Sequence, residues 1–430
     1  MLNGLWLVAR WDIKQRLRSR KLLIAWVVFA VVLTGLAGLL VWNYRINADV
    51  YNNTPGSWGT QAGPAIFGFT VLMILTFSLV IVPAFAASAI VGERESSTLA
   101  TLQATTLGPG QIAGGKLLAS CLVAALFVAA GIPALGIAVG VGHISVWRAL
   151  VCLLVVFAEM VLICAIALGW SAVAARALVS TVLTYVSVFV LCLVSLLIFG
   201  FVGTLISTDA TDHTWALSDD QMNQYAADLD AYFKQHPQPD GSKPPSPPLD
   251  QCGWQSAGYP RTHTHYERVW WMLLVNPYVI VSDAAPLPPD AKGDLQRYNQ
   301  TTSDPLAEIA IGVRGARAGD PATYNDCFAN ITYTYWTPNV GDYNSFTITP
   351  NPDGTFDIDQ TNSFGDDQTR TTAVTVRPPS PIAPSKLTMN TPLWPIGLGV
   401  HLLIAAGFFW LAVRRITVPY GKLPKGQRVA

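Results

Sequence analysis

Six long runs of apolar residues constrain the fold of this chain more than any other feature. They cover about 22–42, 65–91, 112–141, 147–174, 177–206 and 393–413. The hydrocarbon core of a bilayer is about 30 Å thick, and a helix of roughly 20 apolar residues crosses it. Charged residues make up only 13% of the chain, whereas about 25% is usual in soluble domains. The sequence therefore predicts an α-helical membrane protein with six transmembrane helices.

The charges divide the chain into two parts of opposite sign. Residues 207–391 hold 22 acidic and 11 basic residues, a net charge of −11, and the rest of the chain carries +11. Lys and Arg cluster at 10–21, before the first run, and at 414–428, after the last. Because short basic flanks stay in the cytoplasm, we expect both termini there and 207–391 outside a bacterial inner membrane. Arg148, at the predicted outer end of the fourth run, is an exception.

A polar stretch separates the second and third apolar runs. Residues 92–116 read GERESSTLATLQATTLGPGQIAGGK. The charged residues of this stretch are Glu93, Arg94, Glu95 and Lys116. The predicted topology places 92–111 in the cytoplasm, and the spacing of Leu99 and Leu102 predicts a short helix with one apolar face. By charge alone, an ordinary loop on the membrane surface is an equal interpretation.

The same stretch resembles the motif G-E-R-E-x-G-T-L-E-x-L-L-x-T-P-L-x-R-x-x-x-x-x-G-K of ABC-2 type transporter permeases. The shared residues are Gly92, Glu93, Arg94, Glu95, Thr98, Leu99, Leu102, Thr105, Gly115 and Lys116. In that family the motif also lies between the second and third spans. The stretch also departs from the motif: among the differences, Ser97 stands where Gly is usual and Ala100 where an acidic residue is usual.

The plan of the chain also resembles this family, with five clustered spans, an external segment and a sixth span. An apolar stripe on residues 1–21 looks like the interfacial elbow helix of the family; its members are Leu2, Leu5, Trp6, Ala9, Ile13 and Leu17. The resemblance implies a type V exporter-like fold. Its parts are the elbow helix 1–21, helices 1–5 at 22–206 with a coupling loop at 92–111, an extracytoplasmic domain at 207–391, helix 6 at 392–414 and a tail at 415–430.

The resemblance further implies the partners of this chain. The expected contacts with a separate ABC ATPase subunit are Glu93, Arg94, Glu95, Thr98, Leu99 and Leu102. A second permease copy or a homologous permease would complete the transport pathway, with membrane lipid around it and no role for nucleic acid. ATP and magnesium would bind the partner, so no cofactor is expected in this chain.

One segment mimics a nucleotide-binding loop. Residues 110–117 read GQIAGGKL and fit G-x-x-x-x-G-K, but Leu117 stands where the magnesium-binding Ser or Thr belongs. A phosphate-binding loop also needs a preceding strand, and none is predicted here. We therefore do not expect an enzyme, and ATP hydrolysis is assigned to the partner.

Glu159 is the most unusual residue inside an apolar run. About twelve residues into its span, it lies near the middle of the bilayer, where a charge costs about 2.5 to 3.5 kcal/mol. It must be neutral, paired or hydrated, and His401 in the last run is a candidate partner. The two interpretations are a structural hydrogen bond between helices and a role in the transport pathway or its gating.

The acidic segment 207–391 has the composition of a small α+β domain. Ser218 is the expected N-cap of an amphipathic helix that reaches Gln235, a Pro-rich linker follows, and alternating runs after residue 330 predict strands, two of them joined at NPDG as a hairpin. Cys252 and Cys327 predict one disulfide, because both lie in the oxidising compartment.

Two shorter features of this segment allow opposing interpretations. Residues 269–281 are apolar but too short to span, so they form either a core helix or a segment on the outer leaflet. His263, His265 and Glu267 stand at every second position, and on an extended strand they would share one face that could bind a transition metal. Histidines of this kind are more often ordinary surface residues, so we expect no metal site.

Two functions remain compatible with the sequence. The first is the permease subunit of an ATP-driven ABC transporter, expected to be an exporter that works by alternating access. The second is a membrane-anchored sensor or assembly protein whose extracytoplasmic domain binds a ligand.

Overall fold

The structure is a computed structural model. It describes residues 2–50, 58–99, 107–235, 251–254, 259–286, 303–319, 323–325, 331–337, 342–350, 356–361, 368–372 and 391–416. The chain divides into two compact units. A membrane unit comprises Met1–Leu205, Tyr266–Ala318 and Leu387–Ala430, and a second unit comprises Ile206–His265 and Gly319–Lys386. The segment 207–391 is thus shared between the two units, because 266–318 groups with the membrane helices.

Six helical segments among the described residues are long and apolar enough to cross a membrane, which confirms the predicted number. The first span is α2 (Arg20–Val50) and the second is α3 (Trp58–Ala87), which runs on into α4 (Val91–Glu95). The third is α6 (Pro109–Ala130) followed by α7 (Ile132–Gly142), and the fourth is α8 (Val146–Val173). The fifth is α9 (Ala177–Phe189), a π-helical turn η1 (Val190–Val194) and α10 (Ser195–Leu205), and the sixth is α16 (Trp394–Ile416).

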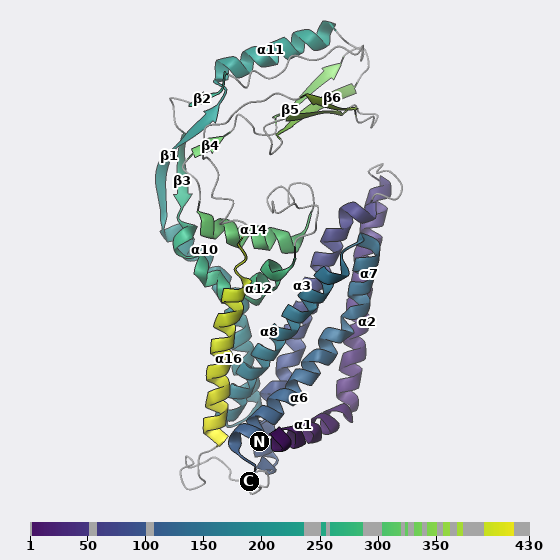
Figure 1. Ribbon diagram of the computed structural model, residues 1–430, viewed down its shortest axis with the longest axis vertical. Helices are drawn as coiled ribbons and strands as arrows, with labels where there is room; N and C mark the ends of the chain where they lie inside the picture. The colour runs from purple at the N-terminus through teal and green to yellow at the C-terminus, as the bar shows by residue number, and fades with distance from the viewer. Residues whose placement is uncertain are drawn as a thin grey trace. The chain divides into compact units, whose positions relative to one another are not determined.

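Helix α8 is the packing centre of the membrane unit (Figure 1). It contacts α3, α6, α9, α12 and α16. In the most apolar 18 residues of α8, 56% of the residues are buried, whereas the corresponding share in the α9–α10 span is 11%. Glycines allow two close helix crossings. A Cβ on Gly63 would lie 2.4 Å from Gly142 Cα, and one on Gly169 would lie 2.6 Å from the Phe408 ring. These approaches join α3 to α7 and α8 to α16.

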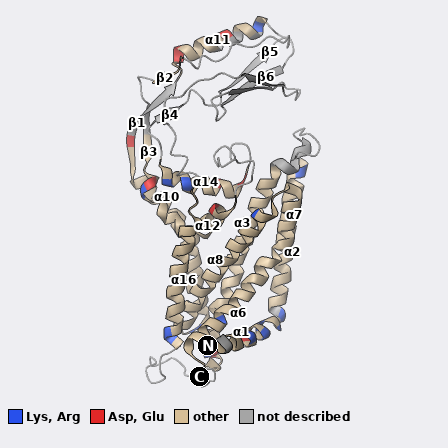
Figure 2. Cartoon of the chain, in the orientation of Figure 1, with Lys and Arg blue, Asp and Glu red and all other residues tan. Residues whose placement is uncertain are grey.

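The N-terminal helix α1 (Leu2–Leu17) packs on α6. Val8 and Ala9 are buried there, whereas Trp6 and Leu17 of the predicted interfacial stripe are 57% and 51% exposed. Figure 2 shows Lys and Arg gathered on α1 and at the adjacent ends of α2 and α16. This basic end of the membrane unit is the one that the charge pattern assigned to the cytoplasm.

The segment after Tyr266 packs on the opposite end of the membrane helices. It contains the 3₁₀ turns η3 (Tyr266–Arg268) and η4 (Trp270–Val275) and the helices α12 (Pro277–Ala284) and α14 (Pro305–Ala318). Ile280 and Val281 are 1% and 0% exposed. Residues 277–284 therefore form a buried helix, as the core-helix interpretation of 269–281 predicted. Asn276 caps α12 by accepting a hydrogen bond from Tyr278 N, and Pro277 takes the first helical position.

Two buried ion pairs fix this segment. Arg148 Nη2 lies 2.5 Å from Asp304 Oδ2, and Arg314 Nε lies 2.6 Å from Asp283 Oδ1. Both carboxylates also cap helices, because Asp304 accepts from Leu306 N and Asp283 accepts from the backbone N–H groups that begin α16. The charge of Arg148, anomalous in the sequence, is therefore neutralised within the membrane unit.

The second unit has an α+β composition. Strand β1 (Ser207–Ala216) pairs with β2 (Gly253–Trp254), β3 (Tyr259–Thr264) and β4 (Thr323–Asn325). A second sheet has the order β5 (Ile331–Thr337), β6 (Asp342–Pro350), β7 (Phe356–Thr361) and β8 (Gln368–Thr372). Strands β6 and β7 pair antiparallel with Pro350 opposite Phe356, which confirms the hairpin predicted at NPDG.

Local details of the second unit match several predictions. Helix α11 (Asp219–Gln235) begins with a capping box, in which Ser218 Oγ accepts from Gln221 N and Gln221 Oε1 accepts from Ser218 N. Cys252 is buried and disulfide-bonded. Cys327 lies outside the described residues, as does the Pro-rich linker at 236–250, so the pairing of Cys252 with Cys327 stays a prediction.

Candidate functional site: a junction at the basic end of the helices

The charged motif forms a junction between helices at the basic end of the membrane unit. We use "α4 junction" for α4, the residues 96–99 that follow it, the start of α6 around Lys116, and the turn from Ser171 to Ala177 between α8 and α9. Ser171 Oγ accepts hydrogen bonds from Ile90 N and Val91 N at 3.0 and 3.1 Å. This side chain, which sequence reasoning missed, thus satisfies the amide groups at the start of α4.

Glu93 and Lys116 form the ionic centre of the junction. Lys116 Nζ lies 2.5 Å from Glu93 Oε1, and the lysine side chain is only 1% exposed. Beside it, Gly115 gives α1 room to pack, because a Cβ there would lie 2.7 Å from Val8 Cβ and 2.9 Å from Leu5 O. The Gly-Lys pair of the motif therefore ties α1, α4 and α6 together.

Arg94 and Glu95 bind the turn between α8 and α9. Arg94 Nη1 and Nη2 donate to Ala174 O and Ala172 O at 3.0 and 3.1 Å, and Glu95 Oε1 accepts from Ala177 N at 2.9 Å. Three successive charged residues thus bind four groups, which belong to α6, the C-terminal end of α8 and the start of α9. A displacement of α4 must move these helices with it or break the contacts.

Leu99 is buried within this chain. It is 6% exposed and lies in an apolar cluster with Ile90, Ile112, Leu168 and Ile416. The apolar face that was expected to meet a partner is therefore covered, at Leu99, by side chains of α6, α8, α16 and the turn that precedes α4. Leu102 lies outside the described residues.

The exposed part of the motif is short. Glu95, Ser96, Ser97 and Thr98 are exposed, whereas Glu93 and Arg94 are half-buried. Ser97 has a φ of 62°, in the left-handed region that L-residues avoid and glycine tolerates. The backbone here therefore explains why the resembling motif has Gly at this position.

We expect Ser97→Gly to stabilise the α4 junction by about 0.5 to 1 kcal/mol, because it removes the Cβ strain of a left-handed residue. The measurement is the melting temperature of the purified chain in detergent. Thr98→Gly is the matched control and should destabilise, because it removes a hydroxyl that donates to Glu93 O. A melting temperature for Ser97→Gly below that of the wild type would contradict this account of the turn.

The segment that mimics a phosphate-binding loop lies in a helix. Residues 110–117 are part of α6, the amides of Gln111 and Ile112 bond Gly108 O, and Lys116 pairs with Glu93. The two histidines of the weak metal candidate are used differently: His263 is buried on β3, and His265 Nε2 lies 2.8 Å from Thr208 Oγ1. Among the described residues no group of three His, Cys, Asp or Glu is placed to hold a metal ion.

Glu159 is paired in the membrane core, and its partner is the predicted one. His401 Nδ1 lies 2.7 Å from Glu159 Oε2, and His401 Nε2 lies 2.9 Å from Val275 O. Nearby, Asn276 Nδ2 donates to Cys192 O, a carbonyl in the π-helical turn η1, at 2.7 Å. The Asn-Pro step at 276–277 carried a signal for a helix cap, but its bond to η1 could not be read from the sequence.

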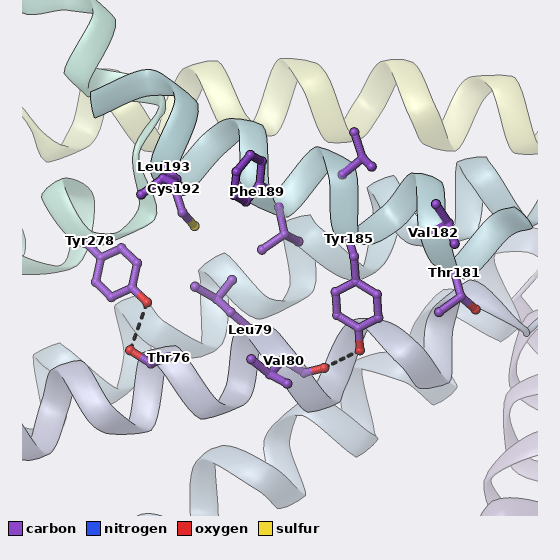
Figure 3. A pocket seen from close by; sticks show the side chains of 12 residues that line it. Thr76, Leu79, Val80, Thr181, Val182, Tyr185, Phe189, Cys192, Leu193 and Tyr278 are labelled. Atoms are coloured by element: carbon purple, nitrogen blue, oxygen red, sulfur yellow. Dashed lines mark hydrogen bonds between the residues drawn. The ribbon is translucent and has the colours of Figure 1, made fainter. Parts of the chain in front are cut away.

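A shallow apolar groove lies beside η1, between α3 and α9 (Figure 3). Its volume is about 560 Å³. Two hydroxyl bonds on its wall join different elements, Thr76 with Tyr278 at 2.9 Å and Tyr185 with Val80 O. The other lining side chains include Leu79, Val182, Val186, Phe189 and Leu193. The groove suits an apolar occupant, such as a lipid chain or a neighbouring helix.

Comparison with known proteins gives two findings. Residues 6–235 match the model of the ABC-2 family transporter protein family. The chain is also 32% identical, over 131 residues, to a probable ABC transporter permease protein, NosY, of Stutzerimonas stutzeri. That similarity covers 30% of this chain and 43% of the relative, so it spans less than half the length of NosY.

Proposed function

The chain belongs to the ABC-2 family of transporter proteins, and from this premise we propose that it is the permease subunit of an ATP-driven transporter with a separate ATPase subunit. The α4 junction is the observation that carries the proposal. Its exposed residues 95–98 offer a contact surface at the basic end of the membrane unit, and the side chains of Glu93, Arg94 and Glu95 bind groups on α6, the end of α8 and α9. An ATPase bound there would move the helices directly.

In the proposed mechanism, a displacement of the ATPase is transmitted to the membrane spans by helices that move as rigid bodies. ATP-driven closure of the partner displaces the turn 95–98, and the ion pair of Glu93 with Lys116 carries the displacement to α6. The bonds from Arg94 to the carbonyls at the end of α8 carry it to the fourth and fifth spans. Alternating access then follows from movement of these helices about the α8 centre, and we propose export as the direction.

A second permease copy or a homologous permease would complete the assembly. In the most apolar 18 residues of the α9–α10 span, only 11% of the residues are buried within the chain. The groove beside η1 adds two tyrosines whose hydroxyls reach polar atoms across it. This face is where we place the contact with the second permease, with lipid as the competing occupant.

Both termini are proposed to lie in the cytoplasm of a bacterial cell, with the chain in its inner membrane. The support is the basic end formed by α1 and the ends of α2 and α16 (Figure 2). Reporter tags inserted at residue 300 and after residue 425 should report opposite sides of the membrane. Two tags on the same side would exclude the six-span topology.

The experiment for the ATPase contact uses a bulky charge on the exposed turn. Ser97 already has a left-handed backbone and an exposed side chain, so Ser97→Arg adds a long cation without a new backbone cost. We expect it to reduce copurification with the ATPase and stimulated ATP turnover at least tenfold, because interface charges change specificity strongly. Glu308→Arg, at an exposed position on α14 at the opposite end of the membrane unit, is the control.

The competing function is a sensor or assembly protein, whose exposed turn would contact a regulatory partner. In that case both Arg variants would leave ATP turnover by a co-produced ABC ATPase unchanged, and Ser97→Arg would not alter its copurification. That result would leave family membership standing and remove the transport proposal.

A further inference from the structure

Three elements of the membrane unit meet at His401. The ring bonds Glu159 of α8 on one side and the carbonyl of Val275 in η4 on the other, at 2.7 and 2.9 Å. Both His401 and Glu159 are 0% exposed. One turn earlier on α16, Gly397 lets η4 approach, because a Cβ there would lie 2.7 Å from Leu274 O. His401 therefore holds α16 against both α8 and η4.

The carbonyl of Val275 determines the protonation of the ring. A carbonyl oxygen only accepts, so His401 Nε2 must carry a hydrogen. The bond on the other side then needs one proton between Nδ1 and Glu159 Oε2. That proton is held either by a carboxylic acid that donates to Nδ1 or by an imidazolium that donates to a carboxylate. Without it, two acceptors would face each other at 2.7 Å.

The second carboxyl oxygen shows which arrangement suits this conformation. Glu159 Oε1 is buried and has no hydrogen-bond partner among the described residues. An ionised carboxylate with one orphaned oxygen is costly in a low-dielectric interior, whereas a carboxylic acid needs fewer partners. The closed pair therefore carries a neutral carboxyl group and a neutral imidazole.

We propose that Glu159 and His401 form a one-proton latch, a proton-binding site that holds α16 against α8 and η4 while the proton is bound and releases them when it is lost. The latch rests on the geometry of three elements and is independent of the ATPase contact. It would make the movement of α16 sensitive to pH.

The neighbouring charges do not compete for this proton. Most charged residues on α8 and the elements packed around it are paired: Lys116 with Glu93, Asp283 with Arg314, and Arg148 with Asp304. Arg414 and Arg415 are distant from the pair, because they lie in the last turn of α16. The other titratable groups on these elements are the thiols of Cys121, Cys152, Cys164 and Cys192 and the phenols of Tyr185 and Tyr278. These groups are uncharged at neutral pH.

The expected pH dependence follows from proton counting. In an opened, hydrated site an imidazole loses its proton near about pH 6.5 and a carboxyl group near about pH 4.3. Above about pH 6.5 the opened site holds no shared proton and the closed latch holds one, so the closed-to-open ratio falls about tenfold per pH unit. Between the two values the proton count is equal, and the ratio is constant.

The test is hydrogen–deuterium exchange of the full chain in nanodiscs, followed at the amides of residues 270–284 between pH 6 and pH 9 and corrected for intrinsic exchange. Wild-type protection should fall about tenfold per pH unit above about pH 6.5. In Glu159→Gln the amide donates to Nδ1 without a titratable proton, so protection should be independent of pH. Glu308→Gln, an exposed carboxyl on α14, should keep the wild-type slope.

Two results would overturn the latch. One is wild-type protection that does not change over this range, and the other is a slope in Glu159→Gln equal to that of the wild type. If Glu159→Gln does not fold, His401→Gln serves instead, followed down to about pH 5: Glu159 keeps the closed-state proton, but the opened site now loses it near about pH 4.3, so the tenfold fall per pH unit should extend below pH 6.5. Protection in His401→Gln that stays constant between about pH 5 and pH 6.5 would assign the proton to another group.

Discussion

Leu99→Asp should destabilise the membrane unit by at least about 3 kcal/mol, one of the largest effects expected from any single substitution in the chain. Leu99 is 6% exposed among apolar side chains of α6, α8, α16 and the turn that precedes α4. The change removes buried apolar surface and places a carboxylate where nothing can solvate it. Thermal unfolding of the purified chain should therefore begin at a clearly lower temperature.

Leu17→Asp is the matched control, because Leu17 on α1 is 51% exposed at the same end of the unit. Its melting temperature should stay close to that of the wild type. An unchanged melting temperature for Leu99→Asp would mean that Leu99 is free in the isolated chain, and it would restore the interpretation of Leu99 as a contact for a partner.

Glu93→Ala should cost about 3 to 5 kcal/mol, because it leaves the ammonium group of Lys116 buried without its partner. Lys116 is 1% exposed and its side chain lies 2.5 Å from Glu93. The double variant Glu93→Ala with Lys116→Met should recover most of this loss, since it removes the uncompensated charge as well. The measurement is a double-mutant cycle of unfolding free energies in detergent.

The cycle separates two accounts of the motif. If Glu93 only contacts a partner, Glu93→Ala and Lys116→Met have independent effects on the stability of the isolated chain. A coupling energy near zero would thus contradict the α4 junction, even if both variants lose the ATPase.

Hydropathy predicted the six spans because each must present about 20 apolar residues to lipid whatever it packs against. The contacts between spans were not predictable to the same degree. Arg148 and Asp304 are 156 positions apart, and neither the sequence distance nor the composition indicates that a segment after the fifth span returns to the end of the fourth. The pairing of Glu159 with His401 could be predicted from the sequence, because buried ionisable residues in spans are few and need partners.

The motif indicated the family correctly, but the sequence did not show which of its side chains turn inward. The spacing of Leu99 and Leu102 indicates an apolar face without saying what covers it, and at Leu99 the cover is the chain itself. Likewise, charge alone cannot tell Glu93, which turns inward to Lys116, from the exposed Glu95. At Ser97 the left-handed backbone gives a physical reason for the Gly that the resembling motif has at this position, and nothing in the structure explains the change to Ser.

Photocrosslinking from residue 97 tests the central claim most directly. A photoreactive amino acid at this exposed position, in cells that also produce a candidate ABC ATPase, should crosslink to that ATPase. The product is identified by peptides that carry its P-loop and LSGGQ sequences. The same amino acid at Trp271, 55% exposed in the segment at the opposite end of the membrane unit, should give no such product. Crosslinks from residue 97 to lipid alone, or equal ATPase crosslinking from both positions, would contradict the assignment of the α4 junction as the ATPase contact.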